Sequence, residues 1–507
     1  MTLRFRNDGT FRVLQMADIQ DKPDVDRDTI RLIREAIRKA DPDLVVFTGD
    51  QIRGYDPAYI DTFLRRRGEQ PGARVRLVTE IEARLQGVKR RIAARHDPDV
   101  PPTEDIVTID DLMDETRGKV RRTFAGFLGP VVEAGVPFAA TYGNHDFQCG
   151  ILADEQDGIY REFPGCLNPP VGSPADAADD GSGPAAPHAI PTAGDDAPGD
   201  HPRLAATVAA SPEAIAPLAI EPGTFAMPVE TSDGSGRIAM SVMMVNSGDY
   251  ADRNTPAERD AQYPLYVANP RGLDLADSDG YGTPSPEAIA WLSDVQRELG
   301  RRNGDGRPVP AIAFQHIPPQ EFYDVLREVP AWTPNAVEGS RAFAGRCFVL
   351  DHDKCRPGSR LGEAIGCADE NVGEVDAMRE AGGYFALFCG HDHKNAFVGH
   401  DDGIDLGYAP TCGFECYGPK SRLRGIRLFE FHEDHPATYV TRMLTWGELV
   451  GRYSHNEVRV WFEDHCITDG VGVRDQMRRP ATFATVAAAL GALAWAIAAP
   501  LRRLTRR

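Results

Sequence analysis

The feature that most constrains the fold is a short apolar run at residues 44–47, which ends at Gly49 and Asp50. Four consecutive apolar residues of β-branched, aromatic and leucine type are typical of a strand buried on both faces. Gly49 permits a sharp turn, so the carboxylate of Asp50 is expected to project from the carboxyl edge of the strand, where open α/β sheets bind ligands. Alone this is a weak signal, because an aspartate after a glycine is usually a turn residue.

The residues before this run predict a strand-helix-strand unit. Residues 11–17 read as a first strand that ends at Asp18, and residues 29–40 carry apolar side chains at helical spacing. Short connections of this kind place the two strands side by side and parallel. Asp18 and Asp50 are therefore expected to share one edge of the sheet.

Three later strands also end in side chains that bind metals. The predicted strand ends carry, in chain order, Asp18, Asp50, the turn Gly143-Asn144-His145-Asp146, His316, and the pair His391 and His393. A single strand-terminal histidine is more often structural than a ligand, but five strand ends chosen independently would rarely all carry Asp, Asn or His. Together they predict a metal site at one edge of a sheet.

Mixed oxygen and imidazole ligands suit divalent first-row ions such as Mn, Fe, Zn or Co. Two such ions need a bridging anion, and Asp50 offers one oxygen to each. A pair of ions holds a hydroxide as nucleophile and clamps the oxygens of a phosphoryl group during displacement. His145 is a candidate to protonate the leaving oxygen; its structural alternative is a turn or helix-cap histidine.

This ordered set of motifs resembles the calcineurin-like metallophosphoesterases, and spans residues 13 to 393. The stretches at residues 45–52, 316–318, 393–397 and 407–418 are similar to the purple-acid-phosphatase-like branch. The resemblance implies an α/β fold: an αββα sandwich of two mixed sheets. By position it implies that Asp18 and His393 hold a first metal, that Asn144, His316 and His391 hold a second, that Asp50 bridges them, and that His145 is catalytic.

Two positions depart from the family pattern. The usual Asp-x-His reads Asp18-Ile19-Gln20, and Gln20 offers only a neutral amide oxygen as a metal ligand. Arg53 stands where purple phosphatases carry a tyrosine ligand. The first site is therefore expected to bind metal more weakly or to favour Mn or Mg, without the colour of an Fe(III) phenolate.

The predicted domain organisation has one catalytic domain at residues 1–470 with two insertions. Residues 57–128 are charged and predict a helical insertion, whereas residues 166–222 are rich in Pro, Ala, Gly and Asp and predict a disordered one. Residues 480–501 contain no charge and predict a C-terminal hydrophobic helix, long enough to span a bilayer. A basic tail follows at 502–507.

The terminal helix predicts a single-pass membrane anchor, with a helix packed on the domain or on a partner as the alternative. No apolar segment of signal-peptide length begins the chain, so the catalytic domain is expected on the cytoplasmic side, or as a cytoplasmic protein if the anchor is absent. Nine scattered cysteines predict free thiols and not a disulfide framework.

The net charge of −20 argues against long nucleic acids as partners. The sequence therefore predicts a phosphatase that acts on a small phosphomonoester or a phosphoprotein through two divalent ions. The alternatives are a phosphodiesterase for nucleotides or glycerophosphodiesters, and a non-catalytic, membrane-tethered binding module in which Gln20 marks a decayed site. Neither the substrate nor the oligomeric state follows from the sequence.

Overall fold

The predicted strand-helix-strand unit forms at the start of the chain in the computed structural model. β2 (Thr10–Met16) and β3 (Leu44–Thr48) pair in parallel, and α1 (Arg27–Ala40) connects them. The side chain of Asp26 caps the first turn of α1, and Asp41 ends the helix in a left-handed conformation. The carboxyl ends of the two strands therefore lie side by side, as the sequence predicts.

The structure describes residues 2–54, 56, 58, 59, 85, 88, 92, 95, 109–171, 216–249, 280–465 and 470–504. Most of the predicted insertions at 57–128 and 166–222, and the end of the predicted basic tail at 502–507, lie outside these residues.

Two mixed sheets form the centre of the described part of the chain. The five-stranded sheet has the order β16-β15-β2-β3-β4, and its other strands are β4 (Phe138–Thr141), β15 (Gly425–His432) and β16 (Val440–Thr445). The eight-stranded sheet has the order β1-β6-β7-β8-β12-β14-β13, with β5 beside β6. Its strands are β1 (Leu3–Arg4), β5 (Ala219–Glu221), β6 (Thr224–Glu230), β7 (Ile238–Met244), β8 (Ala311–Phe314), β12 (Tyr384–Cys389), β13 (Val398–Asp401) and β14 (Ile404–Tyr408).

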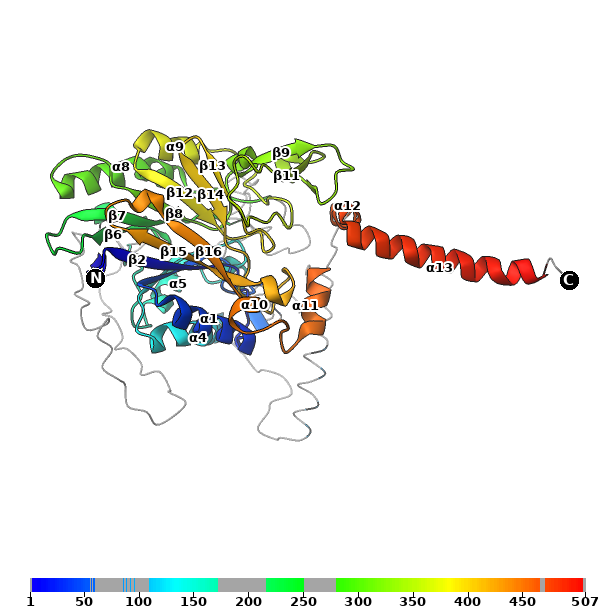
Figure 1. Ribbon diagram of the computed structural model, residues 1–507. Helices are drawn as coiled ribbons and strands as arrows, with labels where there is room; N and C mark the ends of the chain where they lie inside the picture. The colour runs from blue at the N-terminus through cyan, green and yellow to red at the C-terminus, as the bar shows by residue number, and fades with distance from the viewer. Residues whose placement is uncertain are drawn as a thin grey trace.

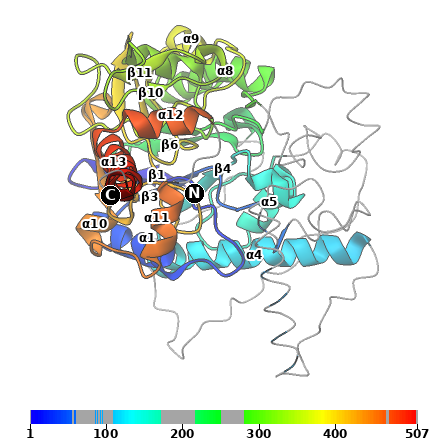
Figure 2. The ribbon, with the colours of Figure 1, turned by 90° about the vertical axis from the view of Figure 1, so that its right-hand side faces the viewer.

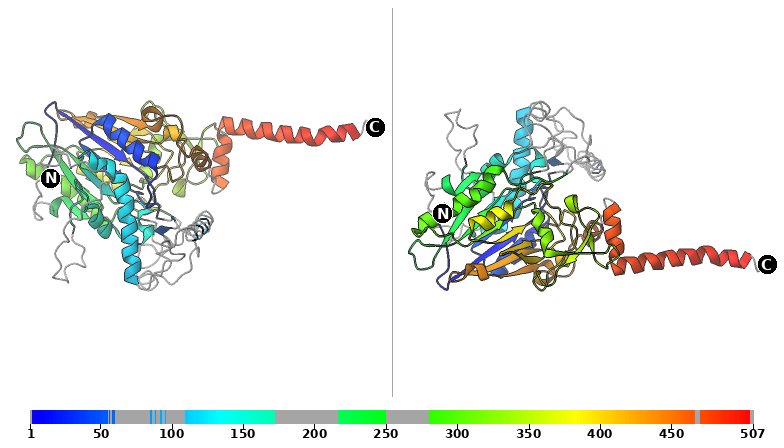
Figure 3. Two further views of the ribbon diagram at one scale, coloured as in Figure 1. Left: turned by 90° about the horizontal axis from the view of Figure 1, so that it is seen from below. Right: turned by 90° about the horizontal axis from the view of Figure 1, so that it is seen from above.

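Helices cover the outer face of each sheet. α1 and α4 (Ile109–Glu133) lie on the five-stranded sheet, with α5 (Ala153–Tyr160) nearby, and α8 (Pro286–Asn303) and α9 (Glu374–Ala381) lie on the eight-stranded sheet (Figure 1). Figure 3 shows α1 and α4 in front when the molecule is seen from below, and α8 and α9 in front from above. The layers are helix, sheet, sheet, helix, which confirms the predicted αββα sandwich.

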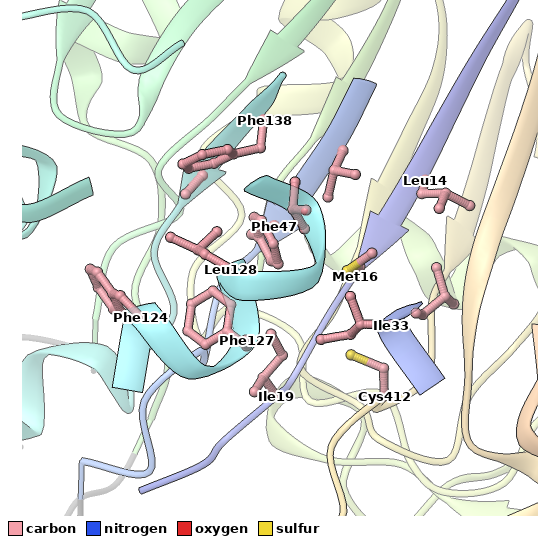
Figure 4. Close-up of a cluster of buried hydrophobic side chains, with 14 of the residues drawn as sticks. Leu14, Met16, Ile19, Ile33, Phe47, Phe124, Phe127, Leu128, Phe138 and Cys412 are labelled. Carbon is pink, nitrogen blue, oxygen red and sulfur yellow. The ribbon is translucent and has the colours of Figure 1, made fainter. Parts of the chain in front are cut away.

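The core follows these layers. Alternate residues of β2 and β3 point in opposite directions, so Val13 and Val46 face the other sheet, whereas Leu14 and Phe47 face the helices. Figure 4 shows Phe47 among the side chains that α4 contributes to this outer layer of the core. Because both faces of β3 are buried, its first four residues are apolar, and the layers hold its carboxyl end in a fixed position.

The sequence did not predict the elements at the C-terminal side of the body. These are the small sheet β10-β11-β9, made of β9 (Leu326–Val329), β10 (Val337–Glu338) and β11 (Cys347–Leu350), and the helices α10 (Trp446–Leu449), α11 (Glu457–Asp464) and α12 (Gly470–Arg478). Figure 2 shows α12 beside β10.

The predicted C-terminal helix is present as α13 (Pro480–Leu504), which projects away from the body (Figure 1). Among the described residues, however, no helix has the length and apolar character needed to cross a membrane. The structure therefore gives no support to the predicted membrane anchor at residues 480–501.

A cavity in the outer layer of the core is expected to destabilise the whole body. Phe127 is fully buried, and its ring centroid lies 5.2 Å from that of Phe47 and 5.6 Å from that of Phe124. We expect Phe127→Ala to lower the free energy of unfolding by about 3–5 kcal/mol in urea titrations. Trp332→Ala is the control, because this side chain is 83% exposed and its loss should change stability by less than about 0.5 kcal/mol. Equal stability of the two variants would contradict the assigned core.

Candidate metal centre

Both sheets contribute side chains to one rim of the sandwich. Asp18 follows β2, Asp50 follows β3, and Asn144 and His145 follow β4 in the five-stranded sheet. His316 follows β8, and His391 and His393 follow β12 in the eight-stranded sheet. Contacts between these residues connect the two sheets, so segments more than 300 residues apart meet at one place.

Asp50 lies at the centre of the group and is buried. One of its carboxylate oxygens lies 3.3 Å from Nε2 of His316 and 3.9 Å from Nε2 of His145, and accepts a hydrogen bond of 2.8 Å from the amide of Gln20. The other oxygen accepts a 2.8 Å hydrogen bond from the backbone N–H of His145. The carboxylate thus contacts groups from several strand ends.

The ligand atoms fall into two groups that share Asp50. Asp50, His316 and His391 form one group, and Asp18, Asp50 and His393 form the other; within each group the atoms lie within 4.8 Å of one another. Carboxylate oxygens and imidazole nitrogens at these separations form a donor set that fits divalent first-row ions. Two metal-binding groups joined by one aspartate is the arrangement that the sequence predicts.

The group around Asp18 also contains Gln20. Nε2 of His393 lies 3.3 Å from a carboxylate oxygen of Asp18 and 3.1 Å from the amide nitrogen of Gln20. Gln20 thus lies where an imidazole is expected, with its amide nitrogen directed at Asp50 and His393. Arg53, at the position of the absent tyrosine, is buried, and its guanidinium lies 3.3 Å from Asp56.

Asn144 and His145 enter the site through their turn. Asn144 is buried between Gly143, whose N–H donates to Asp146, and His145, whose N–H donates to Asp50. Nδ1 of His145 lies 2.7 Å from the side-chain oxygen of Gln148. The imidazole of His145 is therefore oriented by the chain on one side and lies near Asp50 on the other.

Backbone groups fix the orientation of two histidines. Nδ1 of His316 lies 2.9 Å from the carbonyl of Thr48, and Nδ1 of His393 lies 2.6 Å from the carbonyl of Tyr417. When Nδ1 donates to a carbonyl, Nε2 is left to face the metal site, as in many metal-binding histidines. Both residues thus present Nε2 to the ligand group.

Asp146, whose role the sequence pattern did not predict, holds the loops together. Its carboxylate accepts hydrogen bonds from the backbone N–H groups of Gly143, Asp50 and Ile52, at 2.8–2.9 Å. One side chain thereby joins the ends of β3 and β4. Its place in the turn after a predicted strand is the only signal that the sequence offered.

Backbone strain concentrates at the site. Asp18, Gln20, Asp50 and His391 all have positive φ, at 53°, 38°, 54° and 75°. Such conformations cost roughly 1–3 kcal/mol each in non-glycine residues and persist where the surroundings enforce them. The backbone of Gly143 also lies so close to Asp50 that no side chain fits at this position, since a Cβ on Gly143 would lie 2.3 Å from Asp50 Oδ1.

Charge compensation explains the pKa shifts in the centre. Burial alone would raise the pKa of Asp50, but the charges of His316 and His145 hold it well below its usual value. Burial would lower the pKa of His316, but Asp50 and Asp18 raise it to about 9. Burial and the neighbouring His316 lower the pKa of His391 well below its usual value. His316 thus carries a proton that competes with the expected metal for the imidazole.

Two aromatic residues that the sequence did not indicate pack against ligand histidines. The ring of Tyr281 meets that of His391 edge to face, with centroids 4.3 Å apart, and Arg341 lies over Tyr281 at 4.8 Å. The ring of Tyr417 stacks on His393, with centroids 4.0 Å apart. Both contacts join segments distant in sequence, and no local pattern predicts them.

A third cluster lies elsewhere and needs no metal to explain it. Asp26 caps α1, and Asp28 accepts a hydrogen bond from the backbone N–H of His455 and lies 2.9 Å from its ring. His455 is the one residue of this cluster that is distant in sequence from α1.

Comparison with known proteins agrees with the motifs. No family model matches the chain. It is 22% identical over 446 residues to a probable inactive purple acid phosphatase of Arabidopsis thaliana, across 85% of this chain and 77% of the relative. A second Arabidopsis protein of the same description is 25% identical over 155 residues, across 30% of this chain and 33% of the relative. The chain is thus similar in sequence, over most of its length, to a protein described as an inactive purple acid phosphatase.

The structure of a dimetal phosphatase from Danio rerio matches 85% of this chain and 95% of the phosphatase chain, at 12% identity and a TM-score of 0.36. That likeness is too distant to carry an argument. The case for a metal centre therefore depends on the ligand geometry within this chain.

Metal binding should release a proton from His316. Below a pH of about 9 the metal-free imidazole is protonated, whereas a metal ligand must be neutral, so proton and metal compete. We expect the affinity for Mn or Zn to rise with pH up to about 9, by at most about tenfold per pH unit for one proton. Calorimetric titration at pH 7 in two buffers of different ionisation enthalpy measures the protons released, and release of none would contradict this assignment.

Replacement of Gln20 by histidine should strengthen the first site. An imidazole at this position adds a nitrogen ligand beside Asp18 and His393, and we expect Gln20→His to raise the affinity of the weaker metal site by roughly tenfold or more. Competition with a metal indicator resolves the two sites. His400→Gln is the matched control, because this exposed histidine lies beside Asp405 and outside both ligand groups. Equal affinity in Gln20→His and the parent chain would show that Gln20 does not face the metal.

Proposed function

We propose that this chain is a dinuclear-metal phosphoesterase that hydrolyses a phosphomonoester. The observation that carries the proposal is the pair of buried ligand groups that share Asp50. Homology to purple acid phosphatases supports the same class of chemistry. The substrate that we propose is a small phosphate ester or a phosphoprotein, and the net charge of −20 disfavours long nucleic acids.

The residues have separate roles in this proposal. Asp18, Gln20 and His393 hold the first ion, Asn144, His316 and His391 hold the second, and Asp50 contributes to both. When bound, two divalent ions, Mn, Fe, Zn or Co, neutralise charge on the phosphate group and activate a water molecule as the nucleophile.

His145 is the proposed proton donor to the leaving oxygen. Its side chain is only 13% exposed, and its ring is held between Gln148 and Asp50. A protonated imidazole at this place can transfer a proton to a departing alkoxide. Because Gln148 contacts Nδ1, Nε2 is the nitrogen left to act.

A second candidate function is metal binding without catalysis. Two observations favour it: Gln20 replaces a stronger ligand, and the two Arabidopsis relatives are described as probably inactive. Metal content separates this candidate from the hydrolase. A chain that binds two Mn ions and hydrolyses no aryl phosphate would be a binding module.

Loss of the shared ligand or of a second-site histidine should abolish hydrolysis. We expect Asp50→Asn and His316→Ala to reduce kcat/KM on an aryl phosphate by roughly a hundredfold or more, because each removes a ligand at the centre of the site. The assay uses Mn, Zn, Fe and Mg in turn, and compares monoesters with diesters to test the phosphodiesterase alternative. His432→Ala is the control at an exposed position. Normal activity in both site variants would refute the site.

A further inference from the structure

A cavity of about 250 Å³ lies between the sandwich and α12, next to the loop that carries His393. Its walls come from residues 360–362, from Lys394, from the turn at 420–423 and from the C-terminal segment that ends at Arg479. Because these segments are far apart in sequence, the cavity exists only in the folded chain.

Positive charge dominates this cavity, although the whole chain is acidic. The lining contains five cationic residues, Arg360, Lys394, Lys420, Arg422 and Arg479, and two carboxylates, Asp464 and Asp475. The side chains of Lys420 and Arg422 are exposed, whereas those of Arg360 and Arg479 are half-buried. The cations therefore extend from the opening into the interior.

The two carboxylates pair with at most one of these cations. Asp475 is engaged by Arg478, at 2.5 Å, and by the backbone N–H of Glu338. Asp464 lies 3.9 Å from Nζ of Lys394. Within the described part of the chain, no carboxylate lies within ion-pair distance of the other four cations. Arg479 donates instead to the carbonyl of Gly362, at 3.0 Å.

Burial and a neighbouring positive charge both disfavour the protonated form of Arg360. Burial lowers its pKa to about 10, and the neighbouring charge of Arg479 acts in the same direction, although Glu363 and Asp464 oppose both effects. A bound anion would offset the repulsion between the two guanidinium groups. Without such a ligand, two half-buried arginines of like charge are unfavourable.

α12 holds the outer wall of the cavity in place. Arg474 and Arg478 on α12 both donate to Glu338 on β10, at 2.7–3.2 Å. This ion-pair network brings Arg479, the next residue, to the cavity. The geometry thus depends on ion pairs separate from the metal centre.

We propose that this cavity binds a phosphate group. Guanidinium groups bind phosphate oxygens with two parallel hydrogen bonds, and lysines add charge. The volume of about 250 Å³ lies below the ~300–1,000 Å³ of pockets for drug-sized ligands, so it suits a small anion or one anionic group of a larger ligand. The phosphate is either free or a second phosphate on the ester held at the metal centre.

Aromatic packing links the cavity to the metal centre. Nζ of Lys394 lies 5.7 Å from the centre of the Tyr417 ring, and this ring stacks on His393. Tyr417 therefore contacts both His393, a proposed metal ligand, and Lys394 in the cavity wall. Anion binding itself does not rest on the proposed hydrolase activity; only its assignment to a second substrate phosphate does.

The first test measures pyrophosphate binding by calorimetry to the full chain stripped of metal, so that the metal centre contributes little. We expect Arg360→Gln to weaken binding by roughly tenfold or more, because it removes a charge-assisted contact. The double variant Lys420→Gln/Arg422→Gln should do the same, and its exposed positions leave folding intact. Arg442→Gln is the control, since this arginine is exposed and lies outside the cavity. Unchanged affinity in the double variant would overturn the proposal, whatever the fate of Arg360→Gln.

The second test identifies the source of the phosphate in the metal-loaded chain. If it belongs to the substrate, the double variant raises KM for a bisphosphorylated ester and leaves KM for phenyl phosphate unchanged. If it is a free anion, both KM values stay constant while pyrophosphate affinity falls. Should the chain hydrolyse no ester, the binding experiment still decides whether the cavity holds phosphate.

Discussion

The structure depends on a buried carboxylate that needs positive charge beside it. Asp50 is almost fully enclosed, and an uncompensated charge at such a place would cost several kcal/mol. In the metal-free chain His316 supplies that charge, and its raised pKa is the direct consequence. Divalent ions would supply more charge at the same distance. The raised pKa of His316 and the expected metal thus meet the same need for positive charge beside Asp50.

The scaffold enforces this geometry against local preferences. Asp18, Asp50 and His391 adopt left-handed backbone conformations that non-glycine residues rarely accept, and each follows a strand whose last four residues are buried. The three hydrogen bonds to Asp146 hold the turns after β3 and β4 in this conformation. The strain is localised at the rim because the two sheets leave the chain no alternative path. Packing of the two sheets thus holds the ligand residues in fixed positions.

Local sequence pattern and chain order were enough to predict which ligand residues meet at the rim of the sandwich. They did not predict the residues that pack against those ligands. The apolar run before Asp50 is typical of a buried strand, and a short strand-helix-strand unit predicts a parallel neighbour, so Asp18 and Asp50 were expected to meet. Tyr417 and Tyr281 could not be predicted, because their contacts with histidines depend on loops folded by distant residues. The apolar tail at 480–501 did form a helix, yet apolar composition alone did not determine its environment.

Charge distribution connects the two proposed sites. A chain with a net charge of −20 repels a phosphate ester at long range, so binding requires positive potential concentrated at a few places. In the two proposals, divalent ions would provide it at the metal centre, and the cations around Arg360 would provide it in the cavity. Lys394 follows His393 directly, so the same loop contributes to both. The loop after β12 therefore contributes one residue to each site, and the ring of Tyr417 lies against both His393 and Lys394.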